Sequence, residues 1–381
     1  MESAGFTLEE RFLIPSYAKL PISIERGEGV HVWDGEGRKY LDLYGGHAVA
    51  LLGHSPPELV RVLAEQASKL MFYSSVAYSS VRAKAAEDLV SFTGRDMQVF
   101  FSNSGSEANE NALKIARIAT GRAGVVSFEG SFHGRTAGSI AVTGVEKYRR
   151  ENSPHVRFAR FGDIEDLRKN LNESIGAVIF EPIQSLSGVK GASRDYFAAA
   201  FEVCHEAGAL TIFDEIQTGL GRCGSPMYFH KLGVDPDVVS LAKGLAGGFP
   251  VGATLARRAI ARKIKHGDLG STFGAGPLAC ALISATLSIV RDRELSQAAD
   301  ARGGELRSLL AGMPGAMEVR GEGLLIGIKT RKAASELVKT FLSRGILIGS
   351  SLDPEVIRLL PPLTVKKEDL EQFSRTLKEV L

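Results

Sequence analysis

Short, almost wholly apolar runs recur through the middle of the chain, separated by stretches in which apolar residues repeat at helical spacing. The runs cover residues 97–102, 124–128, 176–180, 209–213 and 238–241. Because they are continuous rather than alternating, they predict strands buried on both faces of a parallel sheet. Helices are predicted between them at 106–119, 163–171 and 194–206. The pattern predicts an α/β sheet covered by helices, with functional residues at the carboxyl ends of its strands.

The two ends of the chain follow a different pattern. Residues 30–33 and 40–43 flank a glycine turn at 35–37, which predicts a hairpin. Near the other end, helices are predicted at 277–291 and 295–310, and short strands follow at 324–328 and 356–360. We therefore expect a large domain over residues 51–276 and a smaller α+β domain built from residues 1–50 and 277–381.

Composition disfavours several classes of function. The 381 residues include 46 Lys and Arg against 44 Asp and Glu, so no basic field favours nucleic acid or a membrane surface. No apolar run has membrane-spanning length, and the first residues have neither the basic nor the apolar part of a signal peptide. The three cysteines are odd in number and widely spaced. This spacing disfavours a disulfide framework or a metal site and favours a reducing, cytoplasmic compartment.

An acid and an amine stand at the ends of two neighbouring predicted strands. Asp214 follows the run 209–213, and Lys243 follows 238–242. Each residue alone could be an ordinary surface charge. In one crevice, however, Asp214 could keep a pyridine nitrogen protonated, and a desolvated Lys243 would be a good Schiff-base nucleophile. Pyridoxal phosphate (PLP) is a cofactor that needs both groups.

A glycine turn between a strand and a helix is a candidate phosphate site. The spacing of Ser104 and Glu107 is that of a capping box, which by itself predicts only a well-capped helix. The amides of Gly105 and Ser106, with the Ser106 hydroxyl, could also hold a phosphate there. A second glycine-rich segment at 219–224 matches G-x-G-x-x-G, but it does not open directly from a strand, so it does not indicate a dinucleotide site.

Four further residues are candidates for contacts with a cofactor ring or a substrate. Phe132 follows the run 124–128 and could stack on the ring, while Arg135 could bind a carboxylate through its planar fork. Glu181 follows the run 176–180, and Arg358 lies inside the apolar run 356–360. An arginine in such surroundings needs a partner. Arg358 either forms a structural salt bridge or binds a second substrate carboxylate, in which case it pairs with Glu181 when the site is empty.

In combination, these motifs resemble the class III PLP-dependent aminotransferases of fold type I, and within them the acetylornithine/ornithine group. The matching segments span most of the chain. They are residues 27–34, 40–43, 52–54, 102–109, 132–135, 214–222, 235–237, 242–243, 247–250, 271–273, 321–325 and Arg358.

The resemblance implies a role for each matched residue. Lys243, Asp214 and Glu181 are implied to be catalytic. The implied cofactor contacts are Gly105, Ser106, Phe132, Asp214, Glu215, Ile216, Gln217, Lys243 and Thr272, with Gln217 at the ring oxygen and Thr272 reaching the phosphate of a neighbouring subunit. The implied substrate contacts are Arg135, Ser271 and Arg358. Glu181 and Arg358 resemble a gate that hides one carboxylate site while a terminal-amine donor is bound. No metal is implied.

The implied reaction moves the terminal amino group of an ornithine- or lysine-like donor to 2-oxoglutarate, in a homodimer. N2-acetylornithine is the first expectation for the donor. Three alternatives stay open. The donor could instead be ornithine, 4-aminobutyrate, or a lysine or ornithine linked to a carrier protein. The protein could also be an aminomutase or decarboxylase, or a binding protein without catalytic activity. Two departures from the family pattern affect the donor: Ser185-Leu-Ser-Gly188 replaces Gly-Glu-Gly-Gly, and His47 stands where the family often has an aliphatic residue.

Overall fold

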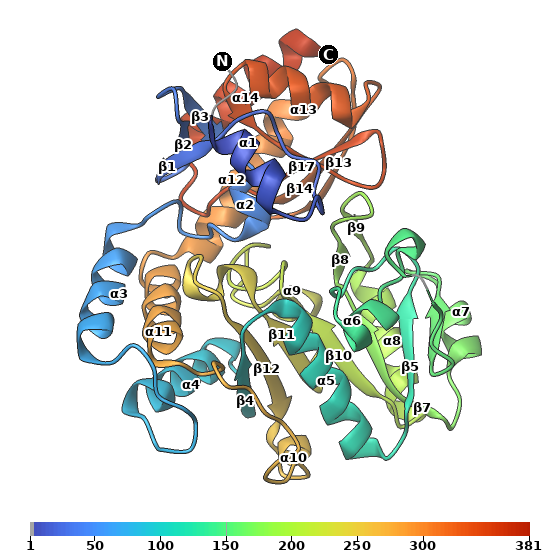
Figure 1. Cartoon of the computed structure of the whole chain (residues 1–381). Coiled ribbons are helices and arrows are strands. Elements are labelled where there is room, and N and C mark those ends of the chain that lie inside the picture. The colour runs from blue at the N-terminus through green and yellow to red at the C-terminus, as the bar shows by residue number, and fades with distance from the viewer. Residues whose placement is uncertain (1–3, 150) are drawn as a thin grey trace.

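Figure 1 shows the computed structural model, which describes residues 4–149 and 151–381. Within this part of the chain the main feature is a seven-stranded sheet. Its order is β4 (Met97–Ser102), β12 (Gly252–Arg257), β11 (Val238–Leu241), β10 (Leu210–Asp214), β7 (Ile175–Phe180), β5 (Gly124–Phe128) and β6 (Val156–Ala159). Strand β12 runs antiparallel to β4 and β11, and all other neighbouring strands of this sheet are parallel to each other. The predicted α/β class with a mostly parallel sheet is confirmed.

The apolar runs form strands because both faces of this sheet are covered. Along β10, Ile212 packs in the cluster that includes residues of α5 (Gly105–Thr120), whereas Phe213 packs in the main core with aromatic residues of α8 (Arg194–Glu206). The same alternation holds for Ile179 and Phe180 on β7. A strand with two apolar neighbourhoods has no polar face to leave exposed, which explains the continuous hydrophobic runs.

The large sheet also contains elements that the sequence analysis did not predict. The predicted strands agree with β4, β5, β7, β10 and β11 to within one residue at each end. The helices at 106–119, 163–171 and 194–206 correspond to α5, α7 (Ile164–Asn170) and α8. Strands β6 and β12 were not predicted.

The two ends of the chain meet above the carboxyl ends of the large sheet, where their blue and red segments lie together in Figure 1. One small sheet joins both ends, in the order β1 (Ile24–Glu28), β2 (His31–Asp34), β3 (Lys39–Asp42) and β15 (Ile346–Leu347). A second has the order β13 (Ala316–Glu322), β14 (Leu325–Thr330), β17 (Val356–Leu359) and β16 (Gly349–Ser350). The domain boundaries at 50/51 and 276/277 stay a prediction.

The remaining elements connect these sheets or cover them. The helices are α1 (Ala4–Phe12), α2 (Gly45–Ala48), α3 (Pro57–Lys69), α4 (Ser80–Thr93), α6 (Ala137–Ala141), α9 (Tyr228–Leu232), α10 (Arg258–Ala261), α11 (Pro277–Asp292), α12 (Leu295–Leu310), α13 (Ala334–Ser343) and α14 (Lys367–Val380). Short 3-10 turns are η1 (Glu146–Tyr148) and η2 (Lys243–Ala246), and β8 (Ile183–Gln184) pairs with β9 (Lys190–Gly191). No helix in the described ranges is long and apolar enough to cross a membrane.

Candidate active site

A cavity of about 790 Å³ lies where the large sheet meets the two chain ends. Most of the residues singled out from the sequence line it. They are Gly105, Ser106, Phe132, Arg135, Glu181, Asp214, Ile216, Gln217, Lys243 and Arg358. Strands β10 and β11 are parallel and adjacent, with Asp214 opposite Ser240, so Asp214 and Lys243 come from the same edge of the sheet.

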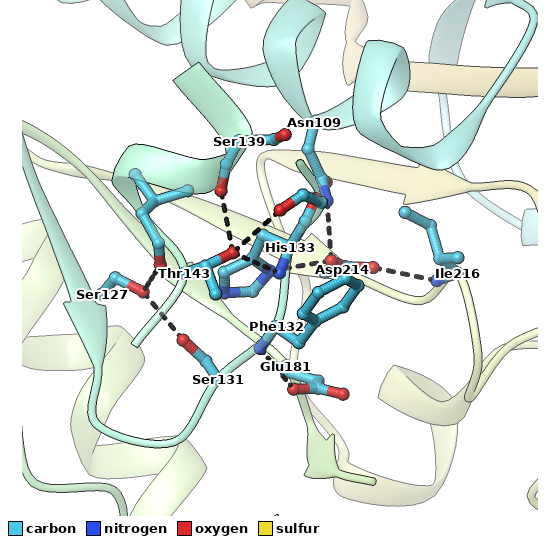
Figure 2. Close-up of polar contacts among 12 residues, drawn as sticks. Asn109, Ser127, Ser131, Phe132, His133, Ser139, Thr143, Glu181, Asp214 and Ile216 are labelled. Carbon is cyan, nitrogen blue, oxygen red and sulfur yellow. Dashed lines mark hydrogen bonds and ion pairs between the residues drawn. The ribbon is translucent and has the colours of Figure 1, made fainter. Parts of the chain in front are cut away.

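Asp214 is a buried carboxylate that three hydrogen bonds hold in one orientation, as Figure 2 shows. Its Oδ2 accepts from Asn109 Nδ2 and faces His133 Nδ1, each at 2.8 Å, and its Oδ1 accepts from the Ile216 amide at 3.1 Å. A carboxylate can accept about four hydrogen bonds. One acceptor position on Asp214 therefore remains for a ligand.

Lys243 occupies an unusual backbone conformation just beyond β11. Its φ of 46° lies in the left-handed region, which a residue with a side chain rarely adopts. Burial lowers the pKa of its amine, while Asp214 and Glu181 act in the opposite direction and Arg358 adds to the lowering. A lowered pKa increases the neutral, nucleophilic fraction of the amine.

The start of α5 forms a tight cradle at the cavity wall. Ser104 caps the helix, with its Oγ accepting from the Glu107 amide at 3.2 Å. A Cβ on Gly105 would lie 2.9 Å from Ile216 Cδ1, and one on Gly134 would lie 2.3 Å from Ser106 Oγ. Ser104, Gly105 and Ser106 line the cavity at the N-terminus of α5, a position where an anion is favoured.

Aromatic rings and a cation also line the cavity, on a segment whose Arg135 amide donates to Ser106 Oγ at 3.2 Å. The Phe132 ring contacts the Tyr148 ring edge-on at 5.8 Å between centroids. The Arg135 guanidinium lies 4.3 Å from the Tyr148 ring centre and 6.0 Å from that of Phe132. Among the residues that the structure describes, Arg135 has no ion-pair partner, so its fork is available to a carboxylate.

Glu181 and Arg358 both line the cavity, but the expected pairing between them is wrong for this structure. Glu181 accepts from the Phe132 amide at 3.1 Å and the Ser185 amide at 3.3 Å. Arg358 donates to Ser185 Oγ at 3.1 Å, to Tyr44 Oη at 2.8 Å and to the Ser350 carbonyl at 2.6 Å. Glu181 thus bonds to backbone amides, Arg358 bonds to a backbone carbonyl and the hydroxyls of Ser185 and Tyr44, and no ion pair joins the two side chains. Burial raises the pKa of Glu181 to about 7.

Three candidate residues lie outside the cavity lining. The Glu215 carboxylate is fully buried and accepts from the Tyr228 and Phe229 amides, each at 2.8 Å, so it fixes the loop after β10 instead of facing the cavity. Ser271 Oγ accepts from Asn103 Nδ2 at 3.1 Å. Thr272 is exposed.

The structure also places residues in the site to which the sequence analysis gave no role. Asn109 and His133 orient Asp214, and Tyr44 orients Arg358. The spacing of Asn109 from Ser106, three residues along a helix, is the signal that would have placed both on one face. No comparable sequence signal identifies Tyr44, because it contacts Arg358 across 314 residues of chain.

Comparison with known proteins gives consistent matches along the chain. Residues 13–381 match the family model described as aminotransferase class-III. The acetylornithine aminotransferase of Methanosarcina acetivorans is 38% identical over 369 residues, covering 95% of this chain and 92% of the relative. That of Archaeoglobus fulgidus is 40% identical over 368 residues, covering 96% of each.

Solved structures agree with the sequence matches. An ornithine aminotransferase from Toxoplasma gondii, described with partial occupancy of PLP at its active site, has a TM-score of 0.94 and 29% identity, covering 100% of this chain and 93% of its own. The acetylornithine aminotransferase of Elizabethkingia anophelis has a TM-score of 0.88 and 33% identity, covering 99% of this chain and 98% of its own.

Proposed function

This chain belongs to the class III aminotransferases, and from that premise we propose that it transfers the terminal amino group of N2-acetylornithine to 2-oxoglutarate with PLP as cofactor. The products are the corresponding semialdehyde and glutamate. The observation that carries the proposal is the single cavity that contains Lys243, Asp214 and two arginines, Arg135 and Arg358.

The cavity residues fit PLP. The remaining acceptor position of Asp214 suits a protonated pyridine nitrogen, and Gln217 lines the cavity near it as a partner for the ring oxygen. Gly105 and Ser106 would hold the phosphate: the Ser106 hydroxyl accepts from the Arg135 amide at 3.2 Å, which leaves its own hydrogen free to donate. Phe132 would stack on the ring. When bound, PLP supplies the electron sink that makes the amine-bearing carbon of a donor acidic.

The chain itself supplies the proton transfers. Lys243 Nζ is the general base that takes the proton from the amine-bearing carbon, and in the second half of the cycle it is the general acid. Burial supports this role because a lowered pKa increases the neutral fraction of the amine, the form that can accept a proton. The contacts of Asn109 and His133 with Asp214 Oδ2 hold the Asp214 carboxylate in one orientation.

Two features favour a dicarboxylate acceptor and an uncharged acyl group on the donor. Arg135 and Arg358 can each bind one carboxylate of 2-oxoglutarate in a bidentate manner. The acids that line the cavity, Glu181 and Asp214, both come from strand ends of the large sheet. Both acids already have partners, since Asp214 bonds to Asn109, His133 and Ile216 and Glu181 bonds to two backbone amides, which disfavours the α-ammonium group of free ornithine.

A donor panel tests the proposal. The PLP-loaded protein is mixed with N2-acetylornithine, ornithine or 4-aminobutyrate, and glutamate formed from 2-oxoglutarate is measured. The highest kcat/KM is expected with N2-acetylornithine. A higher kcat/KM with another donor would make that compound the assigned donor in place of N2-acetylornithine. If no amine gives glutamate, transamination to 2-oxoglutarate is contradicted and an aminomutase or decarboxylase is favoured.

A single substitution tests the assignment of Lys243. Lys243→Ala is expected to abolish both turnover and the visible absorbance band of covalently bound PLP. Lys84→Ala, on the exposed surface of α4, is the matched control and should keep both. Normal turnover by the Lys243 variant would contradict the assignment of Lys243 as the residue that binds PLP and transfers the proton.

The assembly and the compartment are also proposals. Thr272 is exposed, and its neighbour Phe273 is 65% exposed and contacts Phe72 at 5.3 Å. The segment beside it has further exposed apolar side chains at Met71, Tyr73, Val76 and Tyr78. This surface supports a homodimer in which Thr272 reaches the phosphate of the neighbouring site. Light scattering should give the mass of a dimer, and a monomer would contradict it. The three cysteines are buried and free, which supports a reducing cytoplasm.

A further inference from the structure

The two arginines of the cavity are held in different ways. Arg358 is buried and donates three hydrogen bonds through its side chain. Arg135 is exposed, and among the described residues it donates through its backbone amide, to Ser106 Oγ, but not through its guanidinium. That guanidinium lies 4.3 Å from the centre of the Tyr148 ring and 6.0 Å from that of Phe132, the outer limit of a cation–π contact. The Tyr148 ring is therefore the main contact that orients the Arg135 fork.

The backbone sets the position of the Tyr148 ring. Tyr148 ends the turn η1, where its amide donates to the carbonyl of the buried Val145 at 3.1 Å. Just before this turn, Thr143 Oγ1 accepts from the His133 amide at 3.1 Å. The segment that carries Tyr148 is thus bonded to the segment that carries Arg135, which keeps the ring and the guanidinium together at the cavity wall.

A ring orients a guanidinium without occupying its hydrogen-bond donors. The face of an aromatic ring is electronegative, so it attracts the charge of Arg135 but does not neutralise it. A guanidinium has five N–H donors, and here all of them stay available in the plane of the fork. An acid at position 148 would also orient Arg135, but it would accept from the fork and cancel its charge. Tyr148 therefore leaves an oriented, uncompensated cation in the cavity.

We propose that Tyr148 is a positioning residue that holds Arg135 ready for a carboxylate and so favours carboxylate-bearing substrates over plain amines. The inference rests on the proposed function and deepens it, because it names a residue that sets the selectivity of the same site. An arginine that is already oriented loses less side-chain freedom when it binds, which strengthens binding. This contact is made before the reaction starts and is kept throughout it, so Tyr148 should affect KM and not kcat.

The test is a pair of substitutions at one position. Tyr148→Leu removes the ring, and Tyr148→Phe keeps it without the hydroxyl. Both proteins are saturated with PLP, and the first half of the reaction is followed as bleaching of the PLP absorbance band at increasing donor concentration. The donors are N2-acetylornithine and 1-aminobutane, an unbranched amine without a carboxylate.

The expected change is confined to the carboxylate-bearing donor. Tyr148→Leu should raise the half-saturating concentration of N2-acetylornithine about two- to fivefold, the size of one exposed cation–π contact, and leave the limiting rate unchanged. Neither value should change for 1-aminobutane. Tyr148→Phe should restore the wild-type value for N2-acetylornithine, because it keeps the aromatic face.

Two controls separate this role from general damage. Lys147→Ala is the matched control, because the Lys147 ammonium lies 5.0 Å from the same ring but Lys147 does not line the cavity. Its values should equal those of the wild type. Tyr148 also contacts Phe132 edge-on, so Tyr148→Leu is repeated in an Arg135→Ala background. If Tyr148 acts through Arg135, it should cause no further rise there.

Each outcome decides the inference. It is supported by a rise that is specific to N2-acetylornithine, that Tyr148→Phe restores and that Arg135→Ala abolishes. An equal rise for both donors, a fall in the limiting rate alone, or a full effect in the Arg135→Ala background overturns it while the proposed function stands. If Tyr148→Leu does not fold, Tyr148→Met fills more of the ring volume and takes its place with the same expectation. If N2-acetylornithine does not bleach the wild-type band, the proposed function fails and the inference fails with it.

Discussion

Glu215 provides a stability test of the loop that positions the site. Its carboxylate is fully buried beneath the segment carrying Ile216 and Gln217, where it accepts from the Tyr228 and Phe229 amides and from Thr218 Oγ1. Burial raises the pKa of this carboxyl from 4.5 to about 7, although the three hydrogen bonds act in the opposite direction. Between about pH 4.5 and pH 7 the folded protein therefore holds a proton on Glu215 that the unfolded chain has already released.

The sign of the effect follows from this difference. As pH rises above 4.5 the unfolded chain loses the proton first, so the contribution of Glu215 to the free energy of unfolding falls until the pH passes about 7. The change in the pKa of Glu215 from 4.5 to about 7 corresponds to about 3 kcal/mol in the free energy of unfolding. For a chain of 381 residues this is about 4 °C in melting temperature.

Glu215→Gln should remove this pH dependence. Melting temperatures of the wild type and the variant, both saturated with PLP, are measured by calorimetry between about pH 5 and pH 8. Any constant cost of the substitution cancels in the difference between the two proteins. That difference should move by about 3–4 °C in favour of the variant as pH rises. A difference that stays constant with pH would refute the reasoning that Glu215 is protonated in the fold.

Three further predictions concern the site and the core. His133→Phe removes one partner of Asp214 and should lower kcat about 10- to 100-fold with little change in the KM for 2-oxoglutarate. A rise in that KM as large as the fall in kcat would contradict a role through Asp214. Phe132→Leu should raise the dissociation constant of PLP roughly 2- to 10-fold in a titration, and unchanged affinity would contradict stacking. Phe180→Ala should lower the free energy of unfolding in denaturant by about 3–5 kcal/mol, whereas Met317→Ala, 56% exposed, should change it by less than about 0.5; equal effects would contradict the burial of Phe180.

The sequence was most informative where a single physical pattern decides the outcome. Continuous apolar runs located β4, β5, β7, β10 and β11, because burial on both faces leaves no room for polar residues. Strand β12 was missed, although its residues are mostly apolar, because only the 3-10 turn η2 and a short loop separate it from β11, which does not fit the alternation of strand and long helix. The antiparallel direction of β12 follows from its pairing with β4 and β11, which its own residues do not reveal. The short edge strand β6, with Arg157 among its four residues, has too weak a pattern to identify.

The candidate site shows the same limit. The ends of β10 and β11 placed Asp214 and Lys243 together, since parallel neighbours end at the same edge of a sheet. The partners of Arg358 could not be predicted, because Tyr44 and Ser185 reach it from opposite parts of the chain. One alternative from the sequence, also implied by the resemblance, paired Glu181 with Arg358 in the empty site. That expectation overlooked the backbone amides of Phe132 and Ser185, which no sequence pattern reveals.

The pairing of β3 with β15 has a consequence for the order in which the protein forms. Leu41 lies opposite Ile346, so the first small sheet stays incomplete until about 300 further residues have been synthesised. Closing so large a loop is slow, because its entropy must be lost before the contacts are gained. The growing chain can therefore fold its large sheet, whose last strand ends at Arg257, before Arg358 is available to Tyr44. During that interval a nascent chain could take up PLP and still be unable to bind a carboxylate at Arg358.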